Sequence, residues 1–336
     1  MSRRRILTQR LKDGTTNDSP WWLSTDWFGA YIRFISFNNG TTRFLTSSTG
    51  QTLPVSVTKS SKLHGLLKIN ELESLSNFYT PYYSLLNSCK NGTCTQLAEE
   101  FSGYLRVFSK LSFKPMLEED ADALRNALTT IGFYVASHKS SVNWYEDNIR
   151  SVDDYWSKRP SKLKNTVRRK KDKLRKAGDF TLKITKGEEV AKHLADFHRV
   201  YFHSWKVNEP YPAFIDEFAS LAAKNDKLRI GTAYLKGVPV AAQLWFVEQG
   251  VASIFKLAHR PSVEKQSVGS VLTAEMFNHV IEHDNVHTVD FLTGDDPYKK
   301  DWMSKSRPLY TLSAFNTSHL VGLLGACRSR LDRDQT

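Results

Sequence analysis

Three strand-like runs joined by two-residue turns dominate the second half of this sequence and limit what it can fold into. The runs are Lys227–Leu235, Val238–Glu248 and Val251–His259, each rich in β-branched and aromatic residues. Lys236-Gly237 and Gln249-Gly250 separate them, and short connections that contain glycine are typical of tight hairpin turns. We therefore predict a three-stranded antiparallel meander.

A helix and two more strands are expected after the meander. Ser267–His283 places its apolar residues on one helical face, with Ser267 as the N-cap. Val286–Leu292 is predicted to be a buried strand that runs parallel to the strand before the helix, through a crossover connection. Pro308–Asn316 supplies a last strand, so the expected fold is α/β with mixed sheets, in the order β-β-β-α-β-α-β.

Polar residues gather where the predicted strand Val286–Leu292 ends. Asp290 lies near its carboxyl end, and the turn Gly294-Asp295-Asp296-Pro297 follows, with Tyr298 and Lys299 at the start of a new helix. Ligands of α/β folds bind outside the carboxyl ends of strands. We therefore expect a functional site at this turn.

This element order, with a glycine at the start of the helix, resembles the GNAT acyltransferase core. The run Gln266-Ser267-Val268-Gly269-Ser270-Val271 fits that superfamily's Gln/Arg-x-x-Gly-x-Gly/Ala loop at Gln266 and Gly269, whereas Val271 replaces the usual small residue. In the superfamily, backbone N–H groups of this loop hold the pyrophosphate of acyl-CoA, because a helix N-terminus offers free donors and a positive dipole end. The resemblance implies an acyl-CoA co-substrate bound by Gln266, Ser267, Val268, Gly269, Ser270 and Val271.

Other runs are similar to the CelD/BcsL-type (cellulose-biosynthesis-associated) acetyltransferases, which are relatives of the Fem-type peptidyl transferases. The similar runs are Asp290-Phe291-x-x-Gly294…Tyr298-Lys299-x-x-Trp302, Arg168–Gly178, His198–Trp205 and Val240-Ala-Ala-Gln243-Leu. They cover residues 155–315, and Leu72–Leu86 resembles the first half of that branch. The resemblance implies tandem GNAT-like domains, the first degenerate and the second carrying the acyl-CoA site.

A length of 336 residues with 40% hydrophobic residues is enough for two hydrophobic cores. A hairpin of Tyr31–Phe37 and Thr42–Thr46 around an Asn-Asn-Gly turn would fit the first domain. The expected parts are a degenerate GNAT-like domain at 1–154, a basic bridging helix at 155–178, the acyltransferase domain at 179–325 and a polar tail at 326–336.

Acyl transfer requires a polarised thioester carbonyl, an acceptor that loses a proton, and a stabilised or protonated leaving thiolate. In GNAT enzymes a backbone N–H of the strand before the pyrophosphate loop polarises the carbonyl, and here that strand contains Ser253–His259. Asp290 and His259 are the candidate bases, Tyr298 is the candidate acid, and Lys299 could pair with Asp290 or a phosphate. Alternatively, Asp290 caps its turn and Tyr298 packs its helix onto the sheet.

Three further residues are candidate contacts of the acceptor: Gln243, Trp205 and Lys256. Trp205 could equally be a core anchor of its helix. Three histidines, His193, His198 and His203, are spaced by five residues and lie on different helix faces, so we expect no metal site.

The net charge of +12 is concentrated in one segment. Lys158–Lys176 holds eleven lysine and arginine residues and one aspartate, a net charge of +10, with Leu163, Val167 and Leu174 on a thin apolar stripe. Three interpretations stay open: a solvated basic helix, a contact with an acidic partner (a membrane surface, an acidic glycan or the phosphates of the coenzyme), and binding of tRNA or other RNA. The remaining charge is nearly balanced, so we expect no DNA binding. Four nearby aromatic residues could stack on bases but are more simply core residues: Trp144, Tyr145, Tyr155 and Trp156.

Cysteine spacing and hydropathy bear on metal binding and location. Cys89, Cys94 and Cys327 lack the paired spacing of a zinc ribbon, so we expect reduced thiols. No apolar run approaches the ~20 residues that span a bilayer, and the charged start lacks the apolar core of a secretory signal. The expected location is the cytoplasm, with the inner face of the membrane as a peripheral alternative.

The expected activity is transfer of an acyl group, acetyl in the first instance, to an amine or hydroxyl. The resemblance implies an acceptor such as a sugar, a glycan precursor or an amino compound of cell-envelope or exopolysaccharide metabolism. One alternative is a Fem-like transferase that uses aminoacyl-tRNA and contacts it through Lys158–Lys176. Another is a non-catalytic, degenerate GNAT scaffold whose basic helix holds an acidic partner.

Overall fold

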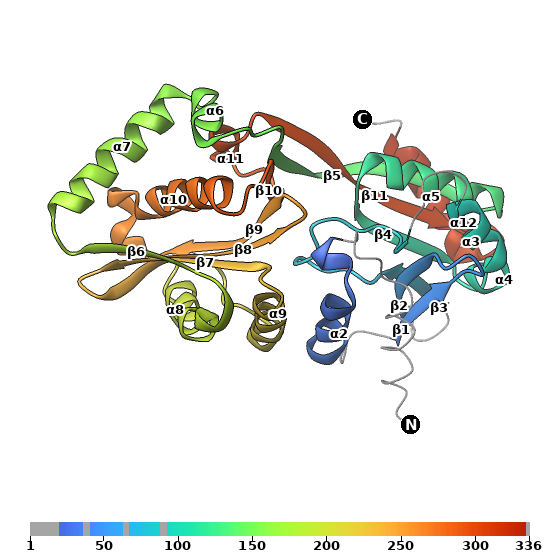
Figure 1. Ribbon diagram of the computed structural model, residues 1–336. Coiled ribbons are helices and arrows are strands. Elements are labelled where there is room, and N and C mark those ends of the chain that lie inside the picture. The colour runs from blue at the N-terminus through green and yellow to red at the C-terminus, as the bar shows by residue number, and fades with distance from the viewer. Residues whose placement is uncertain (1–19, 36–40, 63–66, 88–92, 334–336) are drawn as a thin grey trace. The chain divides into compact units, whose positions relative to one another are not determined.

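The computed structural model describes residues 20–35, 41–62, 67–87 and 93–333 (Figure 1). The chain forms two compact units: Met1–Val142 with Arg307–Thr336, and Asn143–Ser306. These limits differ from the boundaries expected at 154, 178 and 325. The reason is that two long strands, β5 (Tyr134–Glu146) and β11 (Lys305–Phe315), each give residues to both units.

The second unit contains the expected meander. Its strands lie in the order β5-β10-β9-β8-β7-β6, with the bounds β6 Phe180–Thr185, β7 Leu228–Leu235, β8 Val238–Glu248, β9 Val251–His259 and β10 Thr288–Thr293. Antiparallel pairing of β7 with β8 and of β8 with β9, and parallel pairing of β10 with β9, confirm the predicted arrangement. Both turn dipeptides have φ angles of 49° and 73°, and type I′ turns require two positive φ angles.

Helices cover both faces of this sheet (Figure 1). α10 (Val268–Glu282) and α7 (Ser161–Lys176) lie on one side, whereas α8 (Val190–Phe202) and α9 (Pro212–Lys224) lie on the other. Gly231 on β7 lets α10 approach closely, because a Cβ there would lie 2.5 Å from the Met276 sulfur. The short elements of this unit are α6 (Val152–Ser157), η3 (Gly187–Glu189), η4 (Pro261–Gln266) and α11 (Lys299–Trp302).

The first unit repeats the same order of elements. Its strands, in the order β1-β2-β3-β4-β11-β5, include β1 Thr41–Thr46, β2 Thr52–Lys62, β3 Leu67–Ser74 and β4 Lys110–Met116. Its helices are η1 Trp21–Leu23, α2 Thr25–Phe34, α3 Thr93–Glu100, α4 Ser102–Leu105, α5 Glu118–Thr130 and α12 Leu320–Arg333. β1 to β3 form an antiparallel meander, and β4 pairs parallel with β3. The last strand of each repeat pairs with a strand of the other repeat. β5 follows β4 in the chain but pairs with β10, and β11 follows β10 but pairs with β4.

Two expectations for the first unit are wrong. Thr25–Phe34 is helix α2, not part of a hairpin strand, because the Ser24 hydroxyl caps it and its buried aromatic residues recur at helical spacing. The Asn-Asn-Gly turn of that hairpin lies outside the described residues. The tail expected at 326–336 largely belongs to α12, which packs Ala326 against Phe315.

Candidate functional site

The start of α10 offers backbone N–H groups without helical partners. The first hydrogen bond of the helix runs from Val271 N–H to the Ser267 carbonyl (3.1 Å). The N–H groups of Val268, Gly269 and Ser270 precede it and, as at any helix start, have no partner within the helix. Ser267 has a left-handed backbone (φ 54°) and, contrary to expectation, its side chain makes no capping hydrogen bond. These donors and the positive end of the helix dipole suit an anion.

β9 and β10 separate toward their carboxyl ends. Among the described residues their parallel register covers only Val251–Ser253 and Thr288–Asp290. The N–H of Arg260 donates to a β8 carbonyl (2.8 Å). Because backbone directions alternate along a strand, the N–H groups of Leu257 and His259 point away from β8, toward the gap.

A cavity of about 260 Å³ lies at this gap, against the start of α10. Eight of the thirteen residues named as catalytic, coenzyme-binding or acceptor-binding candidates line it: Trp205, Gln243, His259, Ser267, Val268, Gly269, Ser270 and Tyr298. Further lining residues are Leu257, Ala258, Glu264, Thr273 and Trp302. Five other candidates do not line it: Lys256, Gln266, Val271, Asp290 and Lys299. Gln266 is exposed at the end of η4, and Val271 is buried in the core with its N–H already bonded.

His259 ends β9 beside the start of α10. Its ring lies 4.2 Å from the Trp205 ring, centroid to centroid, and a Cβ on Gly269 would lie 3.2 Å from its Nδ1. Burial lowers the pKa of this imidazole, and nearby Lys206 lowers it further against an opposing effect of Glu264. The ring is therefore neutral at pH 7 and can accept a proton.

Tyr298 faces the same cavity with a protonated hydroxyl. Its ring packs edge-on against Phe291 at 5.7 Å, and the residue is 41% exposed. Desolvation of the hydroxyl and the nearby Asp296 carboxylate raise its pKa. The hydroxyl has no hydrogen-bond partner in the part of the chain that the structure describes, so it is free to donate a proton or a hydrogen bond.

Gln243 forms a fixed part of the cavity wall. Its amide nitrogen donates to the Thr273 hydroxyl (2.7 Å), and its amide oxygen accepts from the Trp245 indole (2.8 Å). The Thr273 hydroxyl in turn donates to the Gly269 carbonyl (2.9 Å). Both ends of the amide are thus engaged, and Gln243 ties β8 to the first turn of α10.

Asp290 is buried and holds the end of β10 through hydrogen bonds. It is 5% exposed, and its Oδ1 accepts hydrogen bonds from the Leu292 N–H (2.6 Å) and from the Asn143 amide (2.5 Å). Leu292 has a φ of 56°, which is uncommon for a residue other than glycine. The carboxylate therefore fixes the irregular backbone at the end of β10, where the pairing with β5 shifts register, and this structural role is the simpler of the two considered from the sequence.

Lys299 closes the turn that follows. Its ammonium donates to the carbonyls of Phe291 (3.2 Å), Thr293 (3.1 Å) and Gly294 (3.1 Å), and it lies 3.7 Å from Asp296. Burial lowers the pKa of this lysine, and the nearby carboxylates oppose that effect. Through these contacts Lys299 holds the turn that precedes Tyr298 in place.

Lys206 is a candidate that the sequence analysis missed. Its ammonium lies 5.8 Å from the Trp205 ring centroid and 5.9 Å from that of Tyr201, and it has no ion pair within the described residues. Lys256, expected to contact the acceptor, lies 5.1 Å from the same Tyr201 ring but is paired with Glu209. Burial and the neighbouring Lys256 lower the pKa of Lys206 to about 8. Such a shift is common in functional sites, but no sequence motif marked this lysine.

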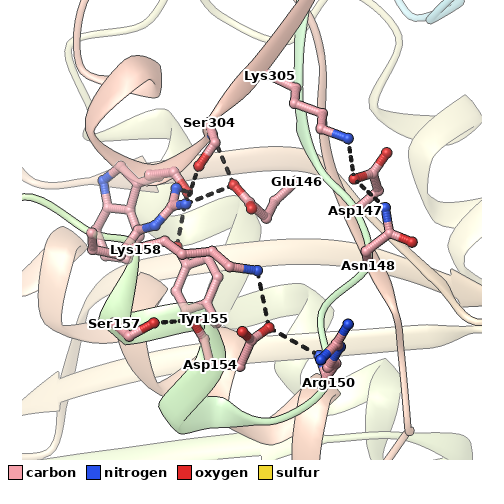
Figure 2. A network of polar contacts seen from close by, with 12 residues as sticks. Glu146, Asp147, Asn148, Arg150, Asp154, Tyr155, Ser157, Lys158, Ser304 and Lys305 are labelled. Carbon is pink, nitrogen blue, oxygen red and sulfur yellow. Dashed lines mark hydrogen bonds and ion pairs between the residues drawn. The ribbon is translucent and has the colours of Figure 1, made fainter.

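A buried ion pair fixes the part of the cavity wall formed by Trp302. The Arg159 guanidinium donates to Glu146 (2.6 Å), and both Arg159 and the Tyr155 hydroxyl donate to the Trp302 carbonyl. Ser304 N–H donates to the same Glu146 carboxylate at 2.8 Å, as Figure 2 shows. The two ionic side chains are 1% and 4% exposed. In the sequence, Arg159 is one of the eleven basic residues of Lys158–Lys176, and nothing in the pattern marks this role.

The basic helix expected from the sequence is α7, which packs through Val167 and Leu174. Lys171 pairs with Glu275 on α10, and Lys170 donates to the Lys265 carbonyl, so these two lysines face the rest of the unit. A shallow open depression lies along the other side of α7, and its basic lining residues are Lys162, Arg168, Arg169, Lys173 and Lys176.

The remaining candidates belong to the core or lie apart. Tyr155 stacks on Phe277 at 4.5 Å, and the Trp156 indole donates to Asn278 (2.8 Å), so neither ring is presented to bases. Two cysteines are free thiols, Cys94 and Cys327, and Cys89 lies outside the described residues. Within the described ranges, no three His, Cys, Asp or Glu side chains come together as metal ligands, and no helix is long and apolar enough to cross a membrane.

Comparison with known proteins agrees with this geometry. Residues 161–300 match the acetyltransferase (GNAT) domain family, and they lie within the second unit. No curated protein matches the chain. Over this region the chain is thus similar to GNAT acetyltransferase domains, and the matched region contains the start of α10 and every residue that lines the cavity except Trp302.

Solved structures resemble the chain over nearly its whole length. The C-terminal domain of an Agrobacterium fabrum protein assigned as a lysylphosphatidylglycerol synthetase has a TM-score of 0.60 at 11% identity, over 96% of this chain and 95% of that one. FemX has a TM-score of 0.60 at 8% identity, over 95% and 97%. L-PGS from Bacillus licheniformis has a TM-score of 0.56 at 13% identity, over 86% and 88%. These similarities establish a shared fold across both units.

Proposed function

We propose that this protein transfers an acyl group, acetyl in the first instance, from acyl-CoA to an amine or hydroxyl acceptor. The observation that carries the proposal is the set of backbone N–H groups without helical partners at the start of α10, on the wall of a cavity where β9 and β10 separate. We infer the acceptor class, a sugar, a glycan precursor or an amino compound of cell-envelope or exopolysaccharide metabolism, from the resemblance to CelD/BcsL-type acetyltransferases. The proposed compartment is the cytoplasm, with the inner face of the membrane as a peripheral alternative.

The residues around the cavity supply each group that acyl transfer needs. The N–H groups of Leu257 and His259 point into the gap and can polarise a carbonyl. Neutral His259 can take the acceptor's proton, and the Tyr298 hydroxyl can protonate a leaving thiolate. Trp205 forms an exposed wall on the acceptor side. We assign Asp290 and Lys299 to holding the turn rather than to proton transfer.

Calorimetric titration with acetyl-CoA and longer acyl-CoAs, with deacylated CoA as the reference, tests the donor. We expect saturable binding that is lost in Gly269→Val, because a side chain there meets the His259 ring. Gly103→Val is the matched control, since the space around this exposed helical glycine is open. Absence of binding by the native protein at millimolar coenzyme, or equal loss in both variants, would refute the proposal.

A second candidate is aminoacyl transfer from aminoacyl-tRNA. It is favoured by the basic outer side of α7 and by the shared fold with FemX and the lysylphosphatidylglycerol synthetases. Filter binding of aminoacyl-tRNA at two salt concentrations tests it, since phosphate contacts make affinity salt-dependent. Arg168→Glu with Arg169→Glu should abolish such binding, whereas Lys236→Glu on an exposed turn should not.

The scaffold alternative predicts that function is lost on charge reversal of α7 and not on substitution in the cavity. Tyr298→Phe and His259→Gln would leave a scaffold's function intact, and charge reversal on α7 would remove it. Because Lys170 and Lys171 face α10 and η4, the reversal belongs at Arg168 and Arg169.

A further inference from the structure

Helix α12 exposes its large apolar residues and buries its small ones. Leu320, Leu324 and Leu331 are 63%, 58% and 63% exposed. On the other side of the helix, a Cβ on Gly322 would overlap the Asn316 carbonyl oxygen, and one on Gly325 would lie 2.6 Å from the Phe315 ring. The helix therefore packs on its sheet through glycine and alanine, and its exposed leucines belong to none of the hydrophobic clusters identified among the described residues.

The exposed leucines form one stripe with arginine on both sides. At 3.6 residues per turn, Leu320, Leu324 and Leu331 fall along one line of α12, with Leu323 (45% exposed) next to it. Arg328 and Arg330 lie to either side of that line. The helix contains three arginines and one aspartate, so its charge is positive.

We propose that α12 (Leu320–Arg333) is a docking helix for the surface of an anionic lipid bilayer. The leucine stripe would lie at the boundary between head groups and acyl chains, and the flanking arginines would contact lipid phosphates, as in interfacial amphipathic helices. This inference does not depend on the proposed acyl transfer.

The size and charge of the stripe favour a lipid surface over a second copy of the chain. α12 has 14 residues, so its stripe is about 21 Å long and about 10 Å wide, or about 210 Å². A stable protein interface buries about 800 Å² on each partner. Pairing two copies along the stripe would also bring arginines of like charge together, whereas anionic head groups would neutralise them.

Co-sedimentation of the full chain with vesicles tests the proposal. We expect binding to phosphatidylcholine vesicles that contain phosphatidylserine, little binding to phosphatidylcholine alone, and weaker binding at high salt. Leu320→Gln with Leu324→Gln should weaken binding at least tenfold. Phe202→Gln with Val207→Gln is the matched control, because these apolar residues are 68% and 89% exposed on another element, and it should retain native binding.

Arg328→Gln with Arg330→Gln should reduce binding to anionic vesicles and its dependence on salt. Melting temperatures of the leucine variant and its control should stay near the native value, because the substituted side chains are exposed. The arginine variant should melt slightly lower, because it loses the contact of the Arg330 guanidinium with the Tyr134 ring, 4.6 Å to the ring centroid. The proposal is overturned if the native chain does not sediment with anionic vesicles, or if the leucine variant binds like the control. A leucine variant that instead converts a dimer into a monomer in light scattering would identify the stripe as a contact between copies.

Discussion

In each unit, one pair of parallel strands stops pairing after three residue pairs. In the first unit a side chain bridges the two strands beyond that point, and in the second unit the strands stay apart. In the first unit, β3 and β4 pair at Glu71–Glu73 and Lys110–Ser112. Ser74 then continues the connection, because its hydroxyl accepts from the Lys114 N–H and donates to the Lys114 carbonyl, each at 3.1 Å. The Ser74 side chain, with Ser76 as a second donor to the Lys114 carbonyl, thus replaces the next backbone hydrogen bonds between β3 and β4.

In the second unit the positions that correspond by register to Ser74 and Lys114 are Ile254 and Leu292. Isoleucine cannot form such a bridge, and the Leu292 N–H is held by Asp290 on its own strand. A serine, Ser112, corresponds to Asp290 in the first unit. The comparison teaches that an opening in a sheet needs an internal acceptor for the N–H group that would otherwise pair across it.

The largest effect is expected from breaking the ion pair that holds the cavity wall in the second unit. Glu146→Ala leaves the Arg159 charge buried and without its carboxylate. We expect a loss of about 3–5 kcal/mol in the free energy of unfolding, measured by denaturant titration. Asp147→Ala, at the next residue, removes an exposed pair with Lys305 and an exposed hydrogen bond from the Asn148 amide, and it should cost under ~1 kcal/mol. Similar losses in both variants would contradict a special role for Arg159.

Removing the carboxylate that keeps the gap open should be nearly as costly. Asp290→Ala leaves the buried Leu292 N–H without its acceptor and removes one of the acceptors of the Asn143 amide, and we expect a loss of about 3 kcal/mol together with weaker acyl-CoA binding. Asp290→Asn retains an acceptor oxygen and should lose less. If Asp290→Ala abolished turnover while stability and acyl-CoA binding stayed native, Asp290 would act in proton transfer instead.

Loosening the bridge in the first unit should have a smaller, local effect. Ser74→Ala removes both contacts with Lys114 and should lower the free energy of unfolding by about 1 kcal/mol. Acyl-CoA binding should not change. Ser76→Ala, which removes one donor to the same carbonyl, should cost less, and a measured loss of coenzyme affinity in Ser74→Ala would show that the first unit also contributes to donor binding.

A last effect, on the pH dependence of stability, concerns Lys206, which has no counterpart in the comparison of strands. Its folded pKa of about 8 lies below the ordinary value of 10.5, so the unfolded chain binds more protons between these values. The lysine's contribution to stability is therefore fully present above about pH 10.5 and is lost as the pH falls through 8. Lys206→Met should remove this rise in unfolding free energy between pH 8 and 10.5, whereas Lys236→Met, on an exposed turn, should keep it.

The sequence was informative where local patterns decide the structure. The meander, its two turns, α10 and the parallel strand β10 follow from alternation, glycine-containing dipeptides and helical periodicity. The roles of side chains were less predictable. The polar atoms of Asp290, Lys299 and Gln243 form hydrogen bonds with backbone or side-chain partners that only the fold brings near. The roles of Arg159 and Lys206 could not be predicted, because they depend on burial, which residue type alone does not reveal.

The exchange of the last strands between the two repeats has a consequence for how the chain can be made and divided. β4 lies near residue 110, but its partner β11 begins only at Lys305. During synthesis the first unit must therefore wait for a strand that emerges after almost all of the second unit. Neither repeat can be excised at a loop without leaving an unpaired strand edge, which favours aggregation. A fragment intended to isolate the GNAT domain should carry β5 as well as residues 161–300.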